Sequence, residues 1–285
     1  MKENLRGLAG AGAEDLGVAA EAAYAGGRSV VDLYADDPEI RSGQWGGPVT
    51  EADRASHAVI LEILARAVPE DRIVSEEDED KGPAPGGGGR LWLVDPLDGT
   101  REYIARNGEF SVMVGLAVEG RATVGAVYQP VPGRLFLGVV GGGSWVVDGW
   151  DDVSGKARSL RVGTEVRRSL RVVRSRSHGD ERLARLEELP GGVDWVVSGS
   201  VGIKCALIAE DRADLYVHPV PYLKEWDTCA PEAVLAGAGG RVTDCHGEPL
   251  TYGKTDPHQP GGIFAARPDA WELAAPVVGR LMDRS

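Results

Sequence analysis

The chain has 285 residues, of which 42% are hydrophobic, enough for a sizeable core in one or two compact units. With 44 acidic against 31 basic residues, the net charge of -13 disfavours a surface that grips the backbone of a nucleic acid polymer. The apolar runs are too short to span a bilayer and no signal peptide is recognisable, so we expect a cytoplasmic protein with no membrane partner. The three cysteines are widely spaced and suggest neither disulfides nor a zinc site, so we expect reduced thiols.

Two helices are predicted before the first strands. Apolar residues between Ile60 and Ala67 keep the i, i+3, i+4, i+7 spacing and predict an amphipathic helix over 51–67, and an alanine-rich stretch predicts an earlier helix over about 13–34. From 90 to 147 the runs are rich in β-forming residues and divided by turn sequences, which predicts antiparallel hairpins. The glycine-rich segment 81–89 is expected to form a flexible flap before them.

The second half of the chain has a different pattern. From about 160, strand-like and helix-like segments alternate, and a final helix follows Pro268, which is typical of α/β architecture. The polar stretch 148–159 is the expected joint. We therefore predict an α+β N-terminal subdomain over 1–155, with the antiparallel sheet, and an α/β C-terminal subdomain over 156–285.

The stretch LWLVDPLDGTREY, residues 91–103, carries the first chemical signal. Pro96 cannot continue a hydrogen-bonded ladder, so we expect it to end the strand and leave Asp95 at the strand tip, with Asp98 on the returning loop. The amides of Gly99 and Thr100 would open the next helical turn and could cradle phosphate oxygens. Because two carboxylates alone would repel a phosphate, this arrangement calls for a divalent cation, and oxygen ligands suit Mg²⁺.

Two alternative interpretations of this stretch exist. DPLDGT has the residues of an ordinary Asx-rich turn. LDGT at 97–100 also resembles the D-x-D-G-T nucleophile loop of haloacid-dehalogenase-type phosphatases. In that loop the nucleophilic aspartate stands two places before the DGT aspartate, and here Pro96 occupies that position, so the second interpretation is excluded.

Further carboxylates stand at the ends of predicted elements. Glu76 directly follows the short apolar strand RIVS, Asp53 in PVTEAD begins the second helix, and Asp227 in KEWDTCAPE begins a helix far downstream. For Asp53 and Asp227 the alternative role is helix capping or stabilisation of the helix dipole. The acids after Glu76 have the alternative of a solvated charge run.

These motifs together resemble a known family. VTEAD, IVSEE, WLVDPLDGT and WDTCAPEAVLAGAGG, in that order, are similar to the motifs of the magnesium-dependent, lithium-sensitive inositol monophosphatase superfamily, and the resemblance extends from about Gly17 to the end. It implies an α+β / α/β layered αβαβα fold of two subdomains, with the active site between them. It also implies hydrolysis of a phosphomonoester by water, without a covalent phosphoenzyme, and inhibition by Li⁺.

The resemblance also implies roles for individual residues. Two or three Mg²⁺ ions would be held by Glu76, Asp95, the backbone carbonyl of Leu97, Asp98 and Asp227. Asp53 and the hydroxyl of Thr100 would orient and deprotonate the attacking water, with Glu76 as a further catalytic residue, and the Gly99 and Thr100 amides would hold the phosphate. Asp227 is expected to contact the substrate as well.

The sequence around these motifs looks most like the branch that hydrolyses 3′-phosphoadenosine 5′-phosphate to AMP, a by-product of sulfate activation. SRSH at 175–178 and Lys204 match positions that hold the nucleotide in that branch. Ser177 and His178 would contact the adenosine, and Lys204 would pair with the 5′-phosphate. The alternatives are a loop histidine for His178 and a solvated helix residue for Lys204.

Two departures from that branch accompany this match. Some relatives have a serine where this chain has Val201, with Ser200 one step earlier, and others have an arginine where it has His218. An inositol or sugar monophosphate phosphatase, including one for fructose-1,6-bisphosphate, is therefore the alternative enzyme, since the metal core is shared. A non-catalytic nucleotide-binding regulatory protein is the alternative of another class. The expected partner is a small phosphorylated nucleotide, and the protein is either a monomer or a homodimer.

Overall fold

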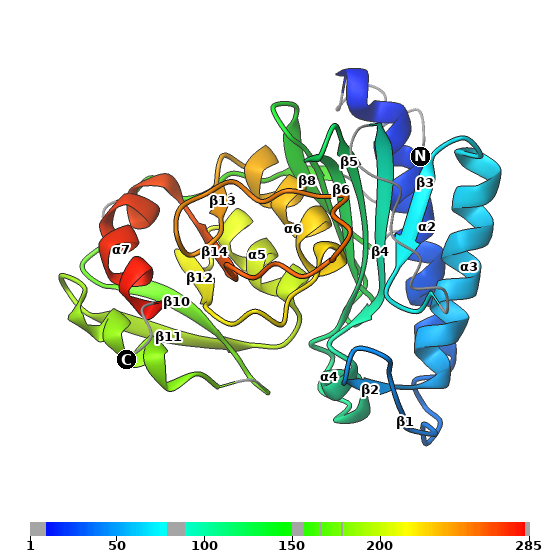
Figure 1. Ribbon diagram of the computed structural model, residues 1–285, viewed down its shortest axis with the longest axis horizontal. Helices are drawn as coiled ribbons and strands as arrows, with labels where there is room; N and C mark the ends of the chain where they lie inside the picture. The colour runs from blue at the N-terminus through cyan, green and yellow to red at the C-terminus, as the bar shows by residue number, and fades with distance from the viewer. Residues whose placement is uncertain (1–9, 79–88, 150–156, 166, 178, 283–285) are drawn as a thin grey trace.

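The computed structural model describes residues 10–78, 89–149, 157–165, 167–177 and 179–282. Most of the expected flap at 81–89 and most of the expected joint at 148–159 lie outside these ranges. The described elements stack in five layers, alternately helical and β, which confirms the predicted αβαβα architecture (Figure 1). Within these ranges no helix combines the length and the apolarity that crossing a bilayer requires.

The first layer consists of two long helices. A short 3-10 turn, η1 (Gly10–Gly12), leads into α2 (Ala13–Asp32), and α3 (Glu51–Ala67) follows. Leu16 of α2 and Ile60 and Leu64 of α3 are fully buried against the neighbouring sheet, as the periodicity predicts. Both predicted helices are confirmed, and α2 ends two residues earlier than expected.

The second layer is a seven-stranded sheet of order β3-β4-β5-β6-β7-β8-β9. Neighbouring strands are antiparallel except for the parallel pair β3–β4, so the predicted hairpins are confirmed. Its strands are β3 (Arg72–Ser75), β4 (Arg90–Asp98), β5 (Ser111–Val118), β6 (Arg121–Gln129), β7 (Arg134–Val139), β8 (Gly143–Asp148) and β9 (Ala157–Ser159). A separate two-stranded hairpin joins β1 (Arg41–Ser42) to β2 (Pro48–Val49).

Side chains alternate between the two faces of this sheet. Trp92 and Val94 of β4 pack with α2 and α3, whereas Leu93 between them packs with the helices of the third layer, α5 (Val201–Ala209) and α6 (Glu225–Gly237). The sheet is therefore covered on both sides, as the continuous apolar run LWLV indicates. The three cysteines, Cys205, Cys229 and Cys245, are free and buried, which agrees with the absence of a disulfide framework.

The fourth layer is a five-stranded sheet of order β11-β10-β12-β14-β13, and η2 (Glu181–Glu188) and α7 (Pro268–Leu281) cover its outer face. The strands are β10 (Leu170–Ser175), β11 (Val193–Ser198), β12 (Leu215–His218), β13 (Arg241–Thr243) and β14 (Ile263–Ala266). The alternation of strands and helices after residue 160 is confirmed. One of the helix-like segments in this half, ERLARLEEL at 181–189, forms a 3-10 helix, whose turns are tighter than those of an α-helix.

The two-subdomain division at 155/156 stays a prediction. The last strand of the seven-stranded sheet, β9, pairs with β8, and helices of the second half pack directly on that sheet.

One local prediction was wrong. Pro96 does not end β4, because the strand continues to Asp98. Asp95 therefore lies inside the strand and not at its tip, and Asp98 is the last strand residue and not part of a returning loop. Regular pairing with β5 stops after Asp95, opposite Met113, and resumes where Asp98 faces Ser111. The ladder to β3 has already ended at Ser75 and Val94, so proline's missing N–H group falls at an irregularity where no regular ladder bond is required.

Candidate active site

Two neighbouring strands bring the first carboxylates together. Glu76 follows the last residue of β3, and its amide donates to the carbonyl of Val94 at 3.1 Å, which fixes it beside β4. Asp95 is only 1% exposed, and its Oδ1 accepts the amide of Leu97 at 3.0 Å across the irregular part of β4. This contact is the local turn that the Asx-turn interpretation predicted. It holds Asp95 in place without excluding a metal.

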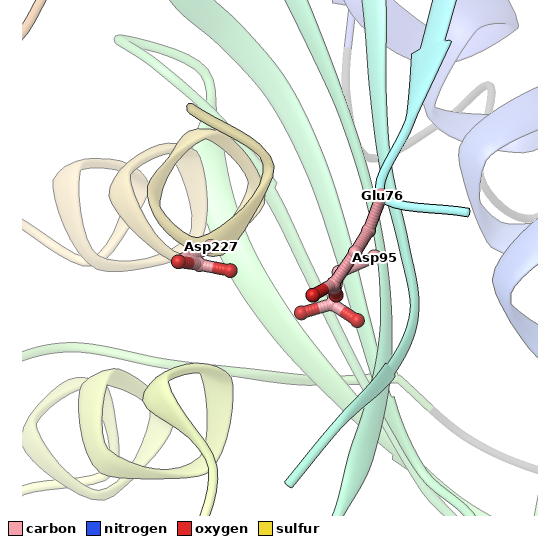
Figure 2. A group of neighbouring side chains, drawn as sticks. All are labelled: Glu76, Asp95 and Asp227. Carbon is pink, nitrogen blue, oxygen red and sulfur yellow. The ribbon is translucent and has the colours of Figure 1, made fainter. Parts of the chain in front are cut away.

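The third carboxylate belongs to a helix of the third layer, which packs on the sheet. Asp227 lies at the third position of α6 and accepts the amide of Lys224 at 2.7 Å, so its capping role is confirmed. One ligand oxygen each of Glu76, Asp95 and Asp227 lies within 4.8 Å of the others. Figure 2 shows the three carboxylates directed toward one another from the end of β3, β4 and the start of α6.

This group carries an electrostatic conflict. Burial, together with repulsion from its neighbours, raises the pKa of Glu76 and of Asp95 well above the ordinary value, and burial raises the pKa of Asp227 to about 7. A divalent cation would remove this conflict, because it attracts all three carboxylates at once. Three converging carboxylates form a donor set of hard oxygens, which fits Mg²⁺.

Asp98 lies beside this group but has partners of its own. Its Oδ2 accepts the Ser200 hydroxyl at 2.5 Å and the Gly202 amide at 3.0 Å, at the start of α5. Burial raises the pKa of Asp98, and the nearby ammonium of Lys204 opposes that shift. Asp98 also repels Asp95, so the two expected ligands of the DPLD motif are neighbours.

Asp53 and Thr100 meet as the sequence predicts, although they lie on different elements. The Thr100 hydroxyl is 3.2 Å from Asp53 Oδ1 and 3.2 Å from the carbonyl of Leu97. Asp53 Oδ2 accepts both the amide and the hydroxyl of Thr50, each at 2.7 Å, in the capping box of α3. The alternative capping role is thus present, and it uses the oxygen that does not face Thr100.

The predicted helical turn after the motif is also present. Gly99 has a φ of 94° and precedes α4 (Thr100–Ile104), whose first closed turn runs from the Tyr103 amide to the Gly99 carbonyl at 3.0 Å. A Cβ at Gly99 would lie 3.2 Å from the Glu109 carbonyl. Glycine suits this position because its φ is left-handed and the surrounding backbone is close.

The structure describes two of the three residues expected to contact a nucleotide, Ser177 and Lys204. Lys204 is 3% exposed, and its Nζ donates to the Ser200 carbonyl at 2.9 Å, so the alternative of a solvated helix residue is wrong. The Ser177 hydroxyl donates to the buried Glu102 carboxylate. His178 lies outside the described residues.

Sequence reasoning missed several residues around this site. Glu102 joins α4 to the second sheet through Ser177, and Ser200 joins Asp98 to α5 from a backbone with a φ of 50°. Trp45, on the β1–β2 hairpin, donates to the carbonyl of Glu76 at 3.2 Å. Only the tryptophan gave a signal in advance, since a large aromatic residue among glycines is unusual for a solvated turn.

Comparison with known proteins gives a consistent assignment. Residues 13–278 match the model of the inositol monophosphatase family. The 3′(2′),5′-bisphosphate nucleotidase CysQ of Escherichia coli O157:H7 is 37% identical over 228 residues, which cover 79% of this chain and 89% of the relative.

Comparison with solved structures leads to the same family. CysQ from Bacteroides thetaiotaomicron, a bacterial member of the inositol monophosphatase family, superposes with a TM-score of 0.77 at 32% identity, covering 89% of this chain and 97% of that one. An inositol monophosphatase from Anabaena (Nostoc) sp. PCC 7120 superposes with a TM-score of 0.70 at 28% identity, covering 93% and 95%. With its motifs, five layers and carboxylate cluster, this chain belongs to the inositol monophosphatase family.

Proposed function

We propose that the protein is a phosphatase that removes the 3′-phosphate from 3′-phosphoadenosine 5′-phosphate and releases AMP and inorganic phosphate. The observation that carries this proposal is the convergence of Glu76, Asp95 and Asp227 beside the Asp53–Thr100 pair. The identity with bisphosphate nucleotidases over most of the chain supports the choice of substrate.

In the proposed site, Glu76, Asp95, the Leu97 carbonyl, Asp98 and Asp227 hold two or three Mg²⁺ ions. Bound Mg²⁺ would neutralise the phosphoryl group, stabilise the leaving oxygen and make a water molecule more acidic. Asp98 would reach an ion with the oxygen that Ser200 and Gly202 leave free.

The protein's own groups handle the water and the phosphate. Thr100 orients the attacking water with its hydroxyl, and Asp53 Oδ1 accepts a proton through that hydroxyl, from 3.2 Å away. Burial raises the pKa of Asp53, which makes this carboxylate a better proton acceptor than a solvated one. The amides of Gly99 and Thr100 hold the phosphate oxygens, and Asp227 and Glu76 border the substrate on the metal side.

Substrate choice depends on the side of the site formed by Ser177, His178 and Lys204. We assign these residues to the adenosine and its 5′-phosphate. Lys204 would have to leave the Ser200 carbonyl to touch a phosphate, and otherwise acts from a distance through its charge. The buried position of Lys204 is the observation that keeps an inositol or sugar monophosphate as the second candidate substrate.

We also propose that the enzyme works in the cytoplasm on this small nucleotide and not on a nucleic acid polymer. The three free buried cysteines and the net charge of -13 support these two assignments.

The test is phosphate release in the presence of Mg²⁺ from four compounds side by side: 3′-phosphoadenosine 5′-phosphate, AMP, inositol 1-phosphate and fructose-1,6-bisphosphate. Asp95→Asn serves as the blank, since it removes a central carboxylate without changing size. Lys204→Met, assayed with the same compounds, isolates the contribution of the ammonium. We expect a strong preference for the nucleotide bisphosphate, which the Lys204 variant loses and the Asp95 variant abolishes together with all activity.

The other outcomes separate the parts of the proposal. Preference for inositol 1-phosphate or the sugar would retain the metal site and reject the assignment of Ser177, His178 and Lys204. Absence of hydrolysis of every compound, combined with binding of the nucleotide, would favour the non-catalytic regulatory protein.

A further inference from the structure

The hairpin β1–β2 presents two unusual side chains at its tip. The Gly43 amide donates to the Gly47 carbonyl at 2.8 Å and closes a tight turn, in which Gly46 has a φ of 88°. Gln44 and Trp45 lie between these glycines: Gln44 is exposed, and Trp45 is partly buried against the hydrophobic cluster that contains Trp226. A tight glycine turn needs neither side chain for its own stability, so their contacts point to another role.

Both side chains bind the backbone just after the metal-ligand candidate Glu76. Gln44 Nε2 donates to the Glu76 carbonyl at 3.1 Å and to the Asp78 carbonyl at 2.6 Å, and Trp45 Nε1 donates to the Glu76 carbonyl at 3.2 Å. β3 ends at Ser75, and beyond it the Glu76 amide still donates to the Val94 carbonyl of β4 at 3.1 Å, so β4 holds the N–H group of Glu76. The hairpin supplies donors for the carbonyl groups of this segment, at Glu76 and Asp78.

The ring of Trp45 reaches the opposite wall of the site. It packs edge-on against Trp226 with ring centroids 5.4 Å apart, and Lys224 Nζ lies 5.6 Å from its centroid. Trp226 is 2% exposed and immediately precedes Asp227 on α6, while the Lys224 amide holds the Asp227 carboxylate. His258 contacts the same ring at 5.7 Å. One side chain thus touches the segment of Glu76 and the start of the helix that carries Asp227.

We infer that Gln44 and Trp45 are positioning residues for the metal site: they fix the spacing between Glu76 and Asp227 and thereby raise the affinity for divalent cations. This inference rests on the proposed metal site. The donors act on a backbone carbonyl and leave the Glu76 carboxylate free to bind a cation. Groups that orient metal ligands in this way typically change metal affinity by about 10-fold to 100-fold when they are removed.

The test measures Mg²⁺ binding directly, by calorimetric titration of the full chain without substrate. Trp45→Phe keeps a ring against Trp226 and removes the N–H donor, and Gln44→Ala removes the donors of an exposed side chain. We expect each variant to bind Mg²⁺ about 10-fold more weakly than the wild type. The lost hydrogen bonds should lower the free energy of unfolding of the metal-free variants modestly, and saturating Mg²⁺ should restore kcat.

Trp271→Phe is the matched control. It removes an indole N–H that donates to the Thr243 hydroxyl at 3.2 Å and keeps the stacked contact with Phe264, in the outer layers of the molecule. Its Mg²⁺ affinity should equal that of the wild type.

The outcomes distinguish this inference from the proposal beneath it. Wild-type Mg²⁺ affinity in both hairpin variants would overturn the positioning role and leave the metal site standing. An equal loss of affinity in Trp271→Phe would also overturn it, because the effect would then be general destabilisation. A wild type that binds no Mg²⁺ would reject the metal site itself, and the positioning role with it.

Discussion

Asp53 uses its two carboxylate oxygens for different purposes. Oδ2 caps α3 through Thr50, whereas Oδ1 faces the Thr100 hydroxyl. The helix cap therefore fixes the orientation of the oxygen proposed to accept a proton, and burial keeps the carboxylate from rotating into solvent. Capping and catalysis are alternative explanations of such a residue in a sequence, but in the structure one geometry serves both.

Replacing Thr100 by valine tests this arrangement. The change keeps the shape and removes the hydroxyl between Asp53 and Leu97. We expect kcat to fall by about 100-fold or more, because the attacking water loses the group that orients it and carries its proton to Asp53. Mg²⁺ affinity, measured by calorimetric titration, should change little.

Thr123→Val is the control for that change. The Thr123 hydroxyl donates to the Leu116 carbonyl at 3.0 Å within the large sheet. Its loss should lower the free energy of unfolding by about 1 kcal/mol and leave kcat unchanged. An equal kcat for Thr100→Val and the wild type would exclude Thr100 from the chemistry.

Glu232 should make the stability of the protein depend on pH. This carboxyl on α6 accepts the Tyr252 hydroxyl, and burial raises its pKa from 4.5 to about 7. Between these two values the folded protein holds a proton that the unfolded chain has released, so this group's contribution to stability is complete below pH 4.5 and is lost as the pH rises to about 7. Glu232→Gln cannot ionise and should lack this loss.

The measurement is the free energy of unfolding by urea for both proteins across that pH range, in the presence of a chelator. The difference between the two curves should change as the pH rises and become constant above about 7. Parallel curves would mean that Glu232 titrates as an ordinary exposed carboxyl.

At the scale of elements, α6 determines whether Asp227 reaches the site. The helix lies against β5, β6 and β7 where these strands carry glycine: a Cβ at Gly125 would lie 2.3 Å from the Ala230 carbonyl, and one at Gly138 would lie 2.4 Å from the Val234 Cα. The helix backbone therefore approaches the sheet more closely than it could if these strand positions carried any residue other than glycine. The glycines of the strands thus set the distance between Asp227 and Asp95.

Gly125→Ala should move the helix. The added methyl group meets backbone atoms that cannot rotate away, so we expect the free energy of unfolding to fall by about 1–3 kcal/mol and Mg²⁺ affinity to fall with it. Chemical denaturation and calorimetric titration measure the two effects. A stability loss without any change in Mg²⁺ affinity would show that Asp227 does not depend on this packing.

Gly17→Ala is the matched control, since a Cβ there meets nothing within 4 Å and Gly17 lies inside α2. Alanine should stabilise this helix by about 1 kcal/mol without affecting Mg²⁺ binding.

The sequence predicts these elements better than their irregularities. Periodicity identifies α3 to the residue and the hairpins of the large sheet, because burial on a regular lattice imposes the pattern. The continuation of β4 beyond Pro96 is not predictable, since it depends on an irregular pairing with a strand that comes later in the chain.

The same limit applies to the site. Glu76, Asp53 and Asp227 are recognisable because each lies at the end of an element. The burial of Lys204 and the contacts of Trp45 come from tertiary packing, to which local patterns are insensitive.

At the scale of the whole molecule, the carboxylate cluster places charged groups at the junction of two layers that otherwise pack through apolar side chains. Glu76 and Asp95 belong to the seven-stranded sheet and its flank, and Asp227 to the helical layer beneath it. Burial is the main cause of the raised pKa values of these three groups, and repulsion between the layers raises the pKa of Glu76 and of Asp95 further. A cation bound there would link the layers, so its binding energy should add to the stability of the fold.

Calorimetric melting of the wild type, with chelator and then with increasing Mg²⁺, tests this link. We expect the melting temperature to rise with the Mg²⁺ concentration, corresponding to about 2.7 kcal/mol when free Mg²⁺ exceeds its dissociation constant 100-fold. Asp227→Asn should melt above the wild type in chelator, because one repelling charge is gone, and should gain much less from Mg²⁺. Asp37→Asn, which removes one charge at an exposed position, should behave as the wild type. If Mg²⁺ stabilises the wild type and Asp227→Asn equally, the cation binds elsewhere and the two layers are not linked through this cluster.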